Sequence, residues 1–292
     1  MERLSAANTQ FSLNLFKKIS GGNTSKNVFY SPISISSALA MVSLGAKGNT
    51  AVQMFKVISH VSPHVKEDQI HSSFNKLMRE LKKPGVQYVL SLANRLYGEQ
   101  SYQFTQTKPV KMMNQKAEFP LALIPEMNSQ VLELPYVGKN LSMLIILPEE
   151  IEDETTGLQK LEKALTYEKL MEWTKPSKMR RQEVEVSLPR FKMEETYDMK
   201  SLLISMGMED VFDGQKVNLS GMSPNNDLVV SKVIHKAFVE VNEEGTEAAA
   251  ATGAVIAIRS FAQMFIADHP FLFFIRHNPS NSILFYGCFC SP

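Results

Sequence analysis

One stretch towards the C-terminal end, residues 228–276, constrains the fold most strongly. Its centre runs from Gly245 to Gly253 and contains four consecutive alanines. Alanine favours helix, but a glycine at either end of the run works against one. A strand-like segment, 228–242, precedes this centre, and the very apolar segment 271–275 follows it. Small side chains between two strands suit a segment that is a loop in one state and a strand in another.

Read as a strand, this centre carries its single charge on one face, because alternate side chains point to opposite faces. One face holds Thr246, Ala248, Ala250 and Thr252, and the other holds Glu247, Ala249, Ala251 and Gly253. The first face has only small side chains and fits a narrow slot within a sheet. A flexible alanine-rich linker is the alternative. The strand-like flanks and the confinement of the charge to one face count against it.

The whole chain indicates a single α+β domain with mostly antiparallel sheets, because helical spacing dominates early and strand-like segments dominate late. Its 292 residues are 44% hydrophobic and 21% charged, an ordinary globular composition, and no repeat or linker divides them. The predicted helices are 4–19, 31–45, 68–82, 158–165, 170–173 and 199–206. The predicted strands are 27–30, 88–97, 131–136, 141–147, 183–188, 228–242, 271–275 and 283–290.

The segment 31–45 carries signals for both of its ends. Ser31 is a good N-cap, and Pro32 occupies the first helical position, where a missing N–H costs nothing. Gly45 is placed to close the C-terminus. These signals predict a helix between Ser31 and Gly45.

The charge of the chain excludes partners that depend on bulk electrostatics. A formal net charge of +1 gives no basis for binding nucleic acid or an anionic membrane. Basic residues cluster at 79–83 and 178–181, where a solvated helix end or loop is preferred to a polyanion site. No apolar run reaches membrane-spanning length, and the first residues do not form a cleavable signal. The expected location is the cytoplasm, with release from the cell left open.

The two cysteines, Cys288 and Cys290, are two positions apart in a predicted strand, so their side chains share a face. Disulfide geometry is demanding, and a bridge within this pair would require the strand to distort. So few cysteines suit a reducing compartment. No further Cys or His follows at ligand spacing, so we expect no metal and no cofactor.

The sequence contains no recognised catalytic motif: it lacks a nucleophile elbow, a phosphate-binding loop, a dinucleotide fingerprint and a zinc-protease helix. His235 lies within a strand-like segment between Val233 and Ala237. A buried histidine bonded to a neighbouring hydroxyl or carbonyl is preferred there to a general base. His269 precedes Pro270 and is expected to anchor a turn. The chain is therefore predicted not to be an enzyme.

Five separated blocks of the chain resemble the serpin family, and within it the intracellular clade B group. They are residues 27–54, 90–98, 131–173, 188–191 and 228–292. In the last block, residues 239–250 are similar to the hinge of the family, and 265–273 are similar to its C-terminal signature. The two motifs together are highly specific, and the blocks span nearly the whole chain.

The resemblance implies an inhibitor of serine-type endopeptidases that works once. An exposed loop acts as bait, the protease forms an acyl-enzyme with it, and the hinge then inserts as a new strand into the central sheet. The implied hinge residues are Glu244, Gly245, Thr246, Glu247, Ala248, Ala249, Ala250, Ala251 and Thr252. The implied signature residues are Asp268, His269, Pro270 and Phe271. The central shutter cluster keeps Ser31, Ser34 and His235 but lacks the asparagine of the family.

Counting along the loop as in the family places the reactive bond at Arg259–Ser260. An arginine there suits trypsin-like proteases, whose acidic pocket pairs with a guanidinium group. The segment that follows is shorter than in relatives. Cleavage after Ile258 or Phe261, by elastase-like or chymotrypsin-like enzymes, is the alternative. The expected partner is thus a serine protease. The inhibitor itself is expected to be a monomer.

The chain is short for the family, and the resemblance implies an internal deletion near residues 104–107 within a single domain, 1–292. Relatives carry two helices and two strands of the central sheet at this junction, including the strand beside which the loop inserts. The expected fold is therefore a serpin fold without those elements. This predicts that the chain inhibits poorly or not at all. The alternatives to an inhibitor are a non-inhibitory serpin-like protein and an inactive truncated form. Segment 228–242 then becomes an exposed edge or pairs with 88–97.

Overall fold

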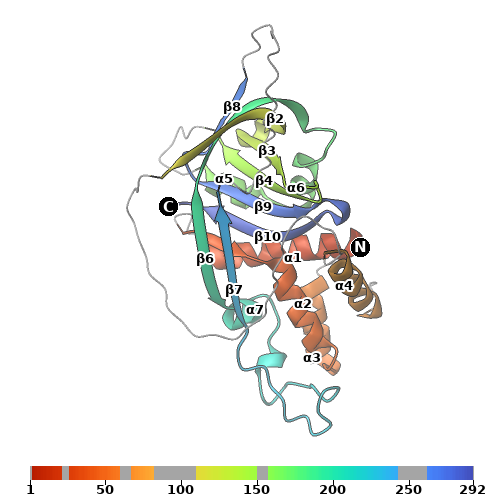
Figure 1. Cartoon of the computed structure of the whole chain (residues 1–292). Helices are drawn as coiled ribbons and strands as arrows, with labels where there is room; N and C mark the ends of the chain where they lie inside the picture. The colour runs from red at the N-terminus through yellow and green to blue at the C-terminus, as the bar shows by residue number, and fades with distance from the viewer. Residues whose placement is uncertain are drawn as a thin grey trace.

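The computed structural model describes residues 2–21, 26–59, 67–81, 110–149, 157–242 and 262–291. Within them lie a large sheet, a two-stranded sheet and several helices, with α1 to α4 gathered beneath β9 and β10 (Figure 1). The helices are α1 (Glu2–Ser20), α2 (Pro32–Ser43), α3 (Gly48–Ser59), α4 (Glu67–Leu81), α5 (Leu158–Ala164), α6 (Tyr167–Trp173) and α7 (Lys200–Ser205). Short 3-10 turns are η1 (Pro125–Met127), η2 (Asp210–Phe212) and η4 (Asn278–Ser280).

The large sheet has eight strands in the order β1-β10-β9-β4-β3-β2-β5-β8, and β6 pairs with β7 in the small sheet. The strands are β1 (Val28–Tyr30), β2 (Met112–Ile124), β3 (Ser129–Pro135), β4 (Leu141–Pro148), β5 (Arg180–Pro189), β6 (Phe191–Asp198), β7 (Ile234–Val241), β8 (Gln263–Ile266), β9 (Phe271–His277) and β10 (Ser282–Phe289). All pairs are antiparallel except β5 with β8. The predicted α+β class with mostly antiparallel sheets is confirmed.

The core consists of two apolar clusters, one on each face of the large sheet. Strand β9 contributes Leu272 and Phe274 to the cluster beneath the helices and Phe271 and Phe273 to the other. That second cluster also receives the inward side chains of β6 and β7. The small sheet therefore packs against the face of the large sheet opposite to the helices. Because both faces are covered, β9 is buried along its whole length.

The predicted hairpin of 131–136 and 141–147 is confirmed as β3 and β4, which pair from Ser129↔Pro148 to Pro135↔Ser142. The turn between them places both Gly138 and Lys139 at positive φ. Every residue of β4 is buried, as its unbroken apolar run predicts, because strands flank it on both sides and a core covers each face.

The start of α2 is confirmed, and the helix ends just before Gly45, the residue predicted to close it. The Ser31 side chain accepts a hydrogen bond from the Ser34 N–H, but the helix stops at Ser43 and its cap, Leu44, is right-handed. Gly45 instead lies against another glycine: the Gly221 N–H donates to the Gly45 carbonyl at 3.0 Å. A Cβ on Gly221 would lie 2.8 Å from that carbonyl oxygen. The close backbone approach therefore requires glycine at 221, whereas a Cβ on Gly45 would clash with the Met222 side chain.

The predicted strand 228–242 is wrong in its first part, because β7 begins only at Ile234. Its partner β6 ends at Asp198, which is paired with Ile234. The Met199 N–H then donates to the Val233 carbonyl at 2.7 Å as the chain turns into α7. The residues before Val233 consequently have no described strand to pair with.

Candidate functional site

Most of the residues predicted to carry the function lie outside the described part of the chain. The hinge residues, Glu244 to Thr252, and the reactive bond Arg259–Ser260 fall within 243–261. The same holds for the predicted strand 88–97 and for the expected deletion near 104–107. The structure does describe the elements that flank the loop, since β7 ends at Val241 and β8 begins at Gln263.

Strand β7 is half buried, with an alternation that continues up to the hinge. His235, Ala237, Val239 and Val241 are buried, and Lys236, Phe238 and Glu240 are exposed. Among the described residues, β7 pairs only with β6. An exposed sheet edge presents unpaired backbone N–H and C=O groups that can accept another extended segment. Within the described part of the chain, the strand leading into the hinge therefore offers one edge for strand addition.

The three predicted shutter residues meet at the N-terminus of α2. The Ser31 N–H donates to Nε2 of His235 at 2.9 Å. The Ser31 hydroxyl donates to the Leu284 carbonyl at 2.8 Å and accepts from the Ser34 N–H at 3.3 Å. Ser31 thus connects β7, β10 and α2 through hydrogen bonds to three other buried residues.

His235 is a buried histidine with a hydrogen-bond partner, as expected, but the kind of partner differs from the prediction. The partner is a backbone N–H rather than a hydroxyl or a carbonyl, so Nε2 must be unprotonated. The imidazole is buried, and this burial lowers the pKa of His235 from 6.5 to about 4. The ring is therefore neutral at physiological pH.

Tyr197 lies on β6 opposite His235, on the inward face of the small sheet, and it was not predicted from the sequence. Its phenol oxygen accepts a hydrogen bond from the Phe29 N–H at 3.1 Å, and the residue pairs with His235 across the two strands. Burial raises the pKa of Tyr197 above its ordinary value and raises the pKa of the nearby Glu195 to about 7. The inward alternation of Phe191, Glu195 and Tyr197 along β6 was the available signal.

The signature residues occupy the turn before β9. The His269 ring lies 2.6 Å from the Pro148 carbonyl through Nε2 and 2.8 Å from the Asp268 carboxylate through Nδ1. Both partners are acceptors, so the ring serves both only when each nitrogen carries a hydrogen. Phe271 is fully buried and packs against Phe289 at a ring separation of 5.3 Å. These contacts agree with the turn-anchor prediction for His269 and join the end of β4 to the core.

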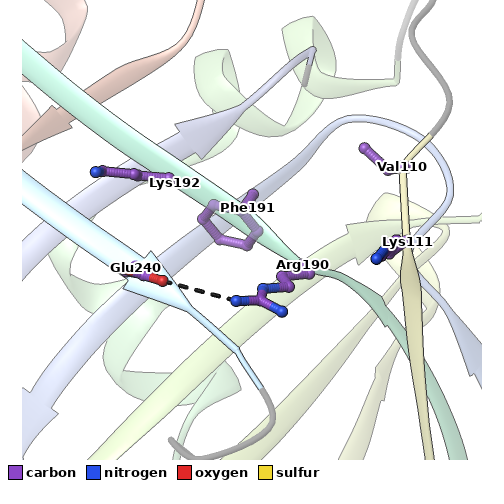
Figure 2. A pocket seen from close by; sticks show the side chains of 6 residues that line it. All are labelled: Val110, Lys111, Arg190, Phe191, Lys192 and Glu240. Atoms are coloured by element: carbon purple, nitrogen blue, oxygen red, sulfur yellow. Dashed lines mark ion pairs between the residues drawn. The ribbon is translucent and has the colours of Figure 1, made fainter.

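A cleft of about 350 Å³ opens beside the end of β7, where the chain leaves towards the hinge (Figure 2). It is lined by Val110, Lys111, Arg190, Phe191, Lys192 and Glu240. Arg190 faces Glu240 at 4.0 Å, and Lys192 lies over the Phe238 ring at 4.9 Å. The cleft holds no nucleophile paired with a base. Across the described residues no group of three or more His, Cys, Asp or Glu could hold a metal ion.

No helix in the described part of the chain is long and apolar enough to cross a membrane.

Comparison with known proteins gives a consistent answer. The family model described as "Serpin (serine protease inhibitor)" matches residues 6–107 and 103–292, in two pieces that meet where the deletion is expected. The leukocyte elastase inhibitors of Equus caballus and Homo sapiens are 43% and 42% identical to the chain, and serpin B6 of Pongo abelii is 42% identical. Each alignment covers all of both proteins and extends over 383 positions, so the 292-residue chain is shortened relative to them.

Solved structures agree with the sequence comparison. Uncleaved ovalbumin is similar with a TM-score of 0.82 and 30% identity, covering 99% of this chain and 100% of ovalbumin. Maspin is similar with a TM-score of 0.78 and 29% identity, covering 100% of this chain and 99% of maspin. The predicted serpin fold is thus confirmed.

Proposed function

Because the chain belongs to the serpin family, and to its clade B group, we propose that it engages trypsin-like serine proteases through Arg259–Ser260. The family consists of serine protease inhibitors, not enzymes, and the names of the relatives above include an elastase inhibitor. The observation that carries the proposal is the hinge sequence. Counting residues from Gly245 of this hinge, as in the family, places the reactive bond after Arg259. Cleavage after Ile258 or Phe261 by elastase-like or chymotrypsin-like enzymes is the alternative.

The proposed reaction begins as ordinary proteolysis. The protease serine attacks the carbonyl carbon of Arg259, the bond to the Ser260 nitrogen breaks, and an acyl-enzyme ester forms. The guanidinium group makes charge-assisted hydrogen bonds to an acidic specificity pocket. The acyl-enzyme then has two fates, which are hydrolysis by water or insertion of the hinge as a strand that carries the protease away.

The second candidate is that this shortened chain is cleaved without trapping the protease. Three observations favour it: β7 has a single described neighbour, the alignments extend 383 positions against 292 residues, and the family model matches in two pieces. Each net backbone hydrogen bond is worth about 0.5–1.5 kcal/mol, so a strand inserted between two neighbours gains on the order of 10 kcal/mol. A strand added to one edge gains roughly half of that. We infer that the acyl-enzyme is hydrolysed faster than the inserted strand can trap the protease.

The contacts of β7 support a role for the shutter cluster in this partition. A strand inserted beside β7 would add to the edge that His235 ties to α2 through the Ser31 N–H. Ser31 in turn holds β10 through the Leu284 carbonyl. We infer that this connection sets how readily the sheet accepts a strand. The proposed setting is a cytoplasmic monomer, with release from the cell left open and no nucleic acid or membrane as partner.

The position of the bait is tested by mass spectrometry after brief exposure to trypsin. The proposal predicts a C-terminal fragment beginning at Ser260 as the first product. The matched control is Arg259→Gln, which keeps a polar side chain of similar length and should suppress this cleavage while other slow cuts continue. A first product that begins elsewhere, or that survives in Arg259→Gln, would overturn the assignment. Elastase and chymotrypsin, run in parallel, test Ile258 and Phe261.

A further inference from the structure

The two cysteines of the chain lie together at the end of β10. Their sulfur atoms are 3.1 Å apart, and neither takes part in a disulfide. Cys288 is 1% exposed and lies within the strand, whereas Cys290 is half buried and lies just beyond the last residue of the strand, Phe289. The pair therefore has one sheltered and one accessible thiol.

The sheet holds the two cysteines differently. Cys288 pairs with Val28 on β1 and Leu272 on β9, and the last pair of β10 is Phe289↔Phe271. Cys290 lies outside this ladder. The distortion expected on forming a bridge would therefore fall at the end of the strand, where Cys290 has no ladder partner.

A side chain, not a neighbouring strand, holds Cys290 in place. Its N–H donates to Oδ1 of Asn27 at 2.7 Å, and the Ser291 N–H donates to the same oxygen at 3.1 Å. Asn27 also donates through Nδ2 to the Ser291 carbonyl at 2.7 Å. A disulfide requires sulfur atoms about 2.05 Å apart, so the two must approach by roughly 1 Å. Rotation of a thiol and a small shift of a side-chain-held segment supply a movement of that size.

The hydrogen bonds give the two thiols different roles. The Cys290 thiol donates to the Lys26 carbonyl at 3.3 Å, so Cys288 supplies the hydrogen between the two sulfurs. This bond and burial together raise the pKa of the Cys288 thiol well above its ordinary value. The accessible Cys290 is the better first nucleophile, because the thiolate is the reactive form and access governs exchange.

We propose that Cys288 and Cys290 form a redox-active dithiol that a low-molecular-weight disulfide oxidises to an intramolecular disulfide. The Cys290 thiolate attacks one sulfur of the small disulfide, forming a mixed disulfide and releasing one small thiolate. Cys288 then loses its proton to solvent and attacks the Cys290 sulfur, releasing the second thiolate. The protein loses two hydrogen atoms, and the small disulfide is reduced to two thiols. The pair is reduced in a cytosolic thiol pool and oxidised after release into an oxidising environment.

The test equilibrates the intact protein in a series of reduced and oxidised glutathione mixtures and traps free thiols by alkylation. Mass spectrometry of the C-terminal peptide should show a species lacking two hydrogen atoms and both alkyl groups, which increases as the mixture becomes oxidising. Two alkylated cysteines throughout the series, a lasting glutathione adduct on the native protein, or a disulfide-linked dimer would each overturn the proposal. Because the measurement uses the unaltered chain, it does not depend on a variant that folds.

Single variants test the assigned roles. Cys288→Ser should accumulate a glutathione adduct on Cys290, because the resolving thiol is absent. Cys290→Ser should leave the buried Cys288 unmodified in the folded protein. The reverse pattern would show that Cys288 is attacked first and would contradict the assignment. Near-ultraviolet circular dichroism of both variants confirms that each is folded.

Discussion

The buried contact between His235 and Ser31 predicts a specific dependence of stability on pH. The ring accepts the Ser31 N–H at 2.9 Å and is 6% exposed. Burial lowers the pKa of His235 from 6.5 to about 4. The experiment lowers the pH of the wild-type protein and of a matched variant, His235→Gln. The glutamine amide oxygen can accept the same hydrogen bond, but the amide does not titrate between about pH 4 and pH 7.

The sign of the effect follows from the protons bound by each state. Below about pH 6.5 the unfolded chain protonates His235, whereas the folded protein does not do so until about pH 4. Stability from this residue is therefore fully present above 6.5 and is lost as the pH falls through this window. One pKa unit corresponds to about 1.4 kcal/mol, so the whole shift is worth about 3 kcal/mol, of which about 2 kcal/mol is lost by pH 5.

Urea unfolding of both proteins at about pH 7.5 and at about pH 5 measures this effect. These two pH values lie about one unit or more on either side of the ordinary histidine pKa of 6.5. The wild-type protein should lose about 2 kcal/mol more than His235→Gln on acidification, since the other titrating groups are common to both and cancel. Equal losses in the two proteins would refute the assignment of a neutral buried acceptor. A smaller loss in the wild type would indicate that His235 is charged in the folded state.

Three further predictions concern residues elsewhere in the fold. Burial raises the pKa of Glu162 to about 7, so Glu162→Gln should raise the unfolding free energy at pH 8 but not at pH 4.5, as measured by urea unfolding. Arg276→Met should lower that free energy by about 3 kcal/mol, because it leaves the half-buried carboxylate of Glu133, which lies 3.1 Å from the Arg276 guanidinium, unpaired. Adding Glu133→Leu should recover most of the loss, and no recovery would contradict the coupling. Gly221→Ala should cost about 1–3 kcal/mol by thermal unfolding, because its Cβ meets the Gly45 backbone; an unchanged midpoint would contradict this.

The sequence predicted best those elements whose signals are local. The hairpin of β3 and β4 follows from two apolar runs around a glycine-containing turn, and α2 begins where Ser31 and Pro32 indicate. Strands β9 and β10 are continuous apolar runs separated by polar turn residues. In each case the pattern belongs to neighbouring residues, and burial follows from it directly.

The elements that were missed or misread depend on distant parts of the chain. Strand β2 has a weak alternation and contains Pro120, and its pairing with β5 and β3 decides its structure. Strand β8 is four residues long and exists through its parallel pairing with β5. Segment 228–233 has strand-like composition but no described strand to pair with, and the close approach of Gly221 to Gly45 joins distant parts of the chain. Propensity could not indicate these outcomes, because tertiary context overrides it.

The candidate site shows the same division. His235 and Ser31 were identified by resemblance, but the bond between them joins residues 204 positions apart and uses a backbone N–H that no sequence pattern reveals. The exposed and buried alternation of β7 was readable from the sequence. The proximity of the Cys288 and Cys290 sulfurs was not, because it depends on where β10 ends.

The central claim is that trypsin cleaves Arg259–Ser260 and that the shortened chain then releases the protease instead of trapping it. The most direct measurement titrates trypsin with the protein, counts covalent complexes on a denaturing gel and records the remaining protease activity. We predict two fragments, few complexes and nearly full trypsin activity after the protein has been consumed. A stable covalent complex that accounts for most of the protein added, with matching loss of trypsin activity, would contradict the claim.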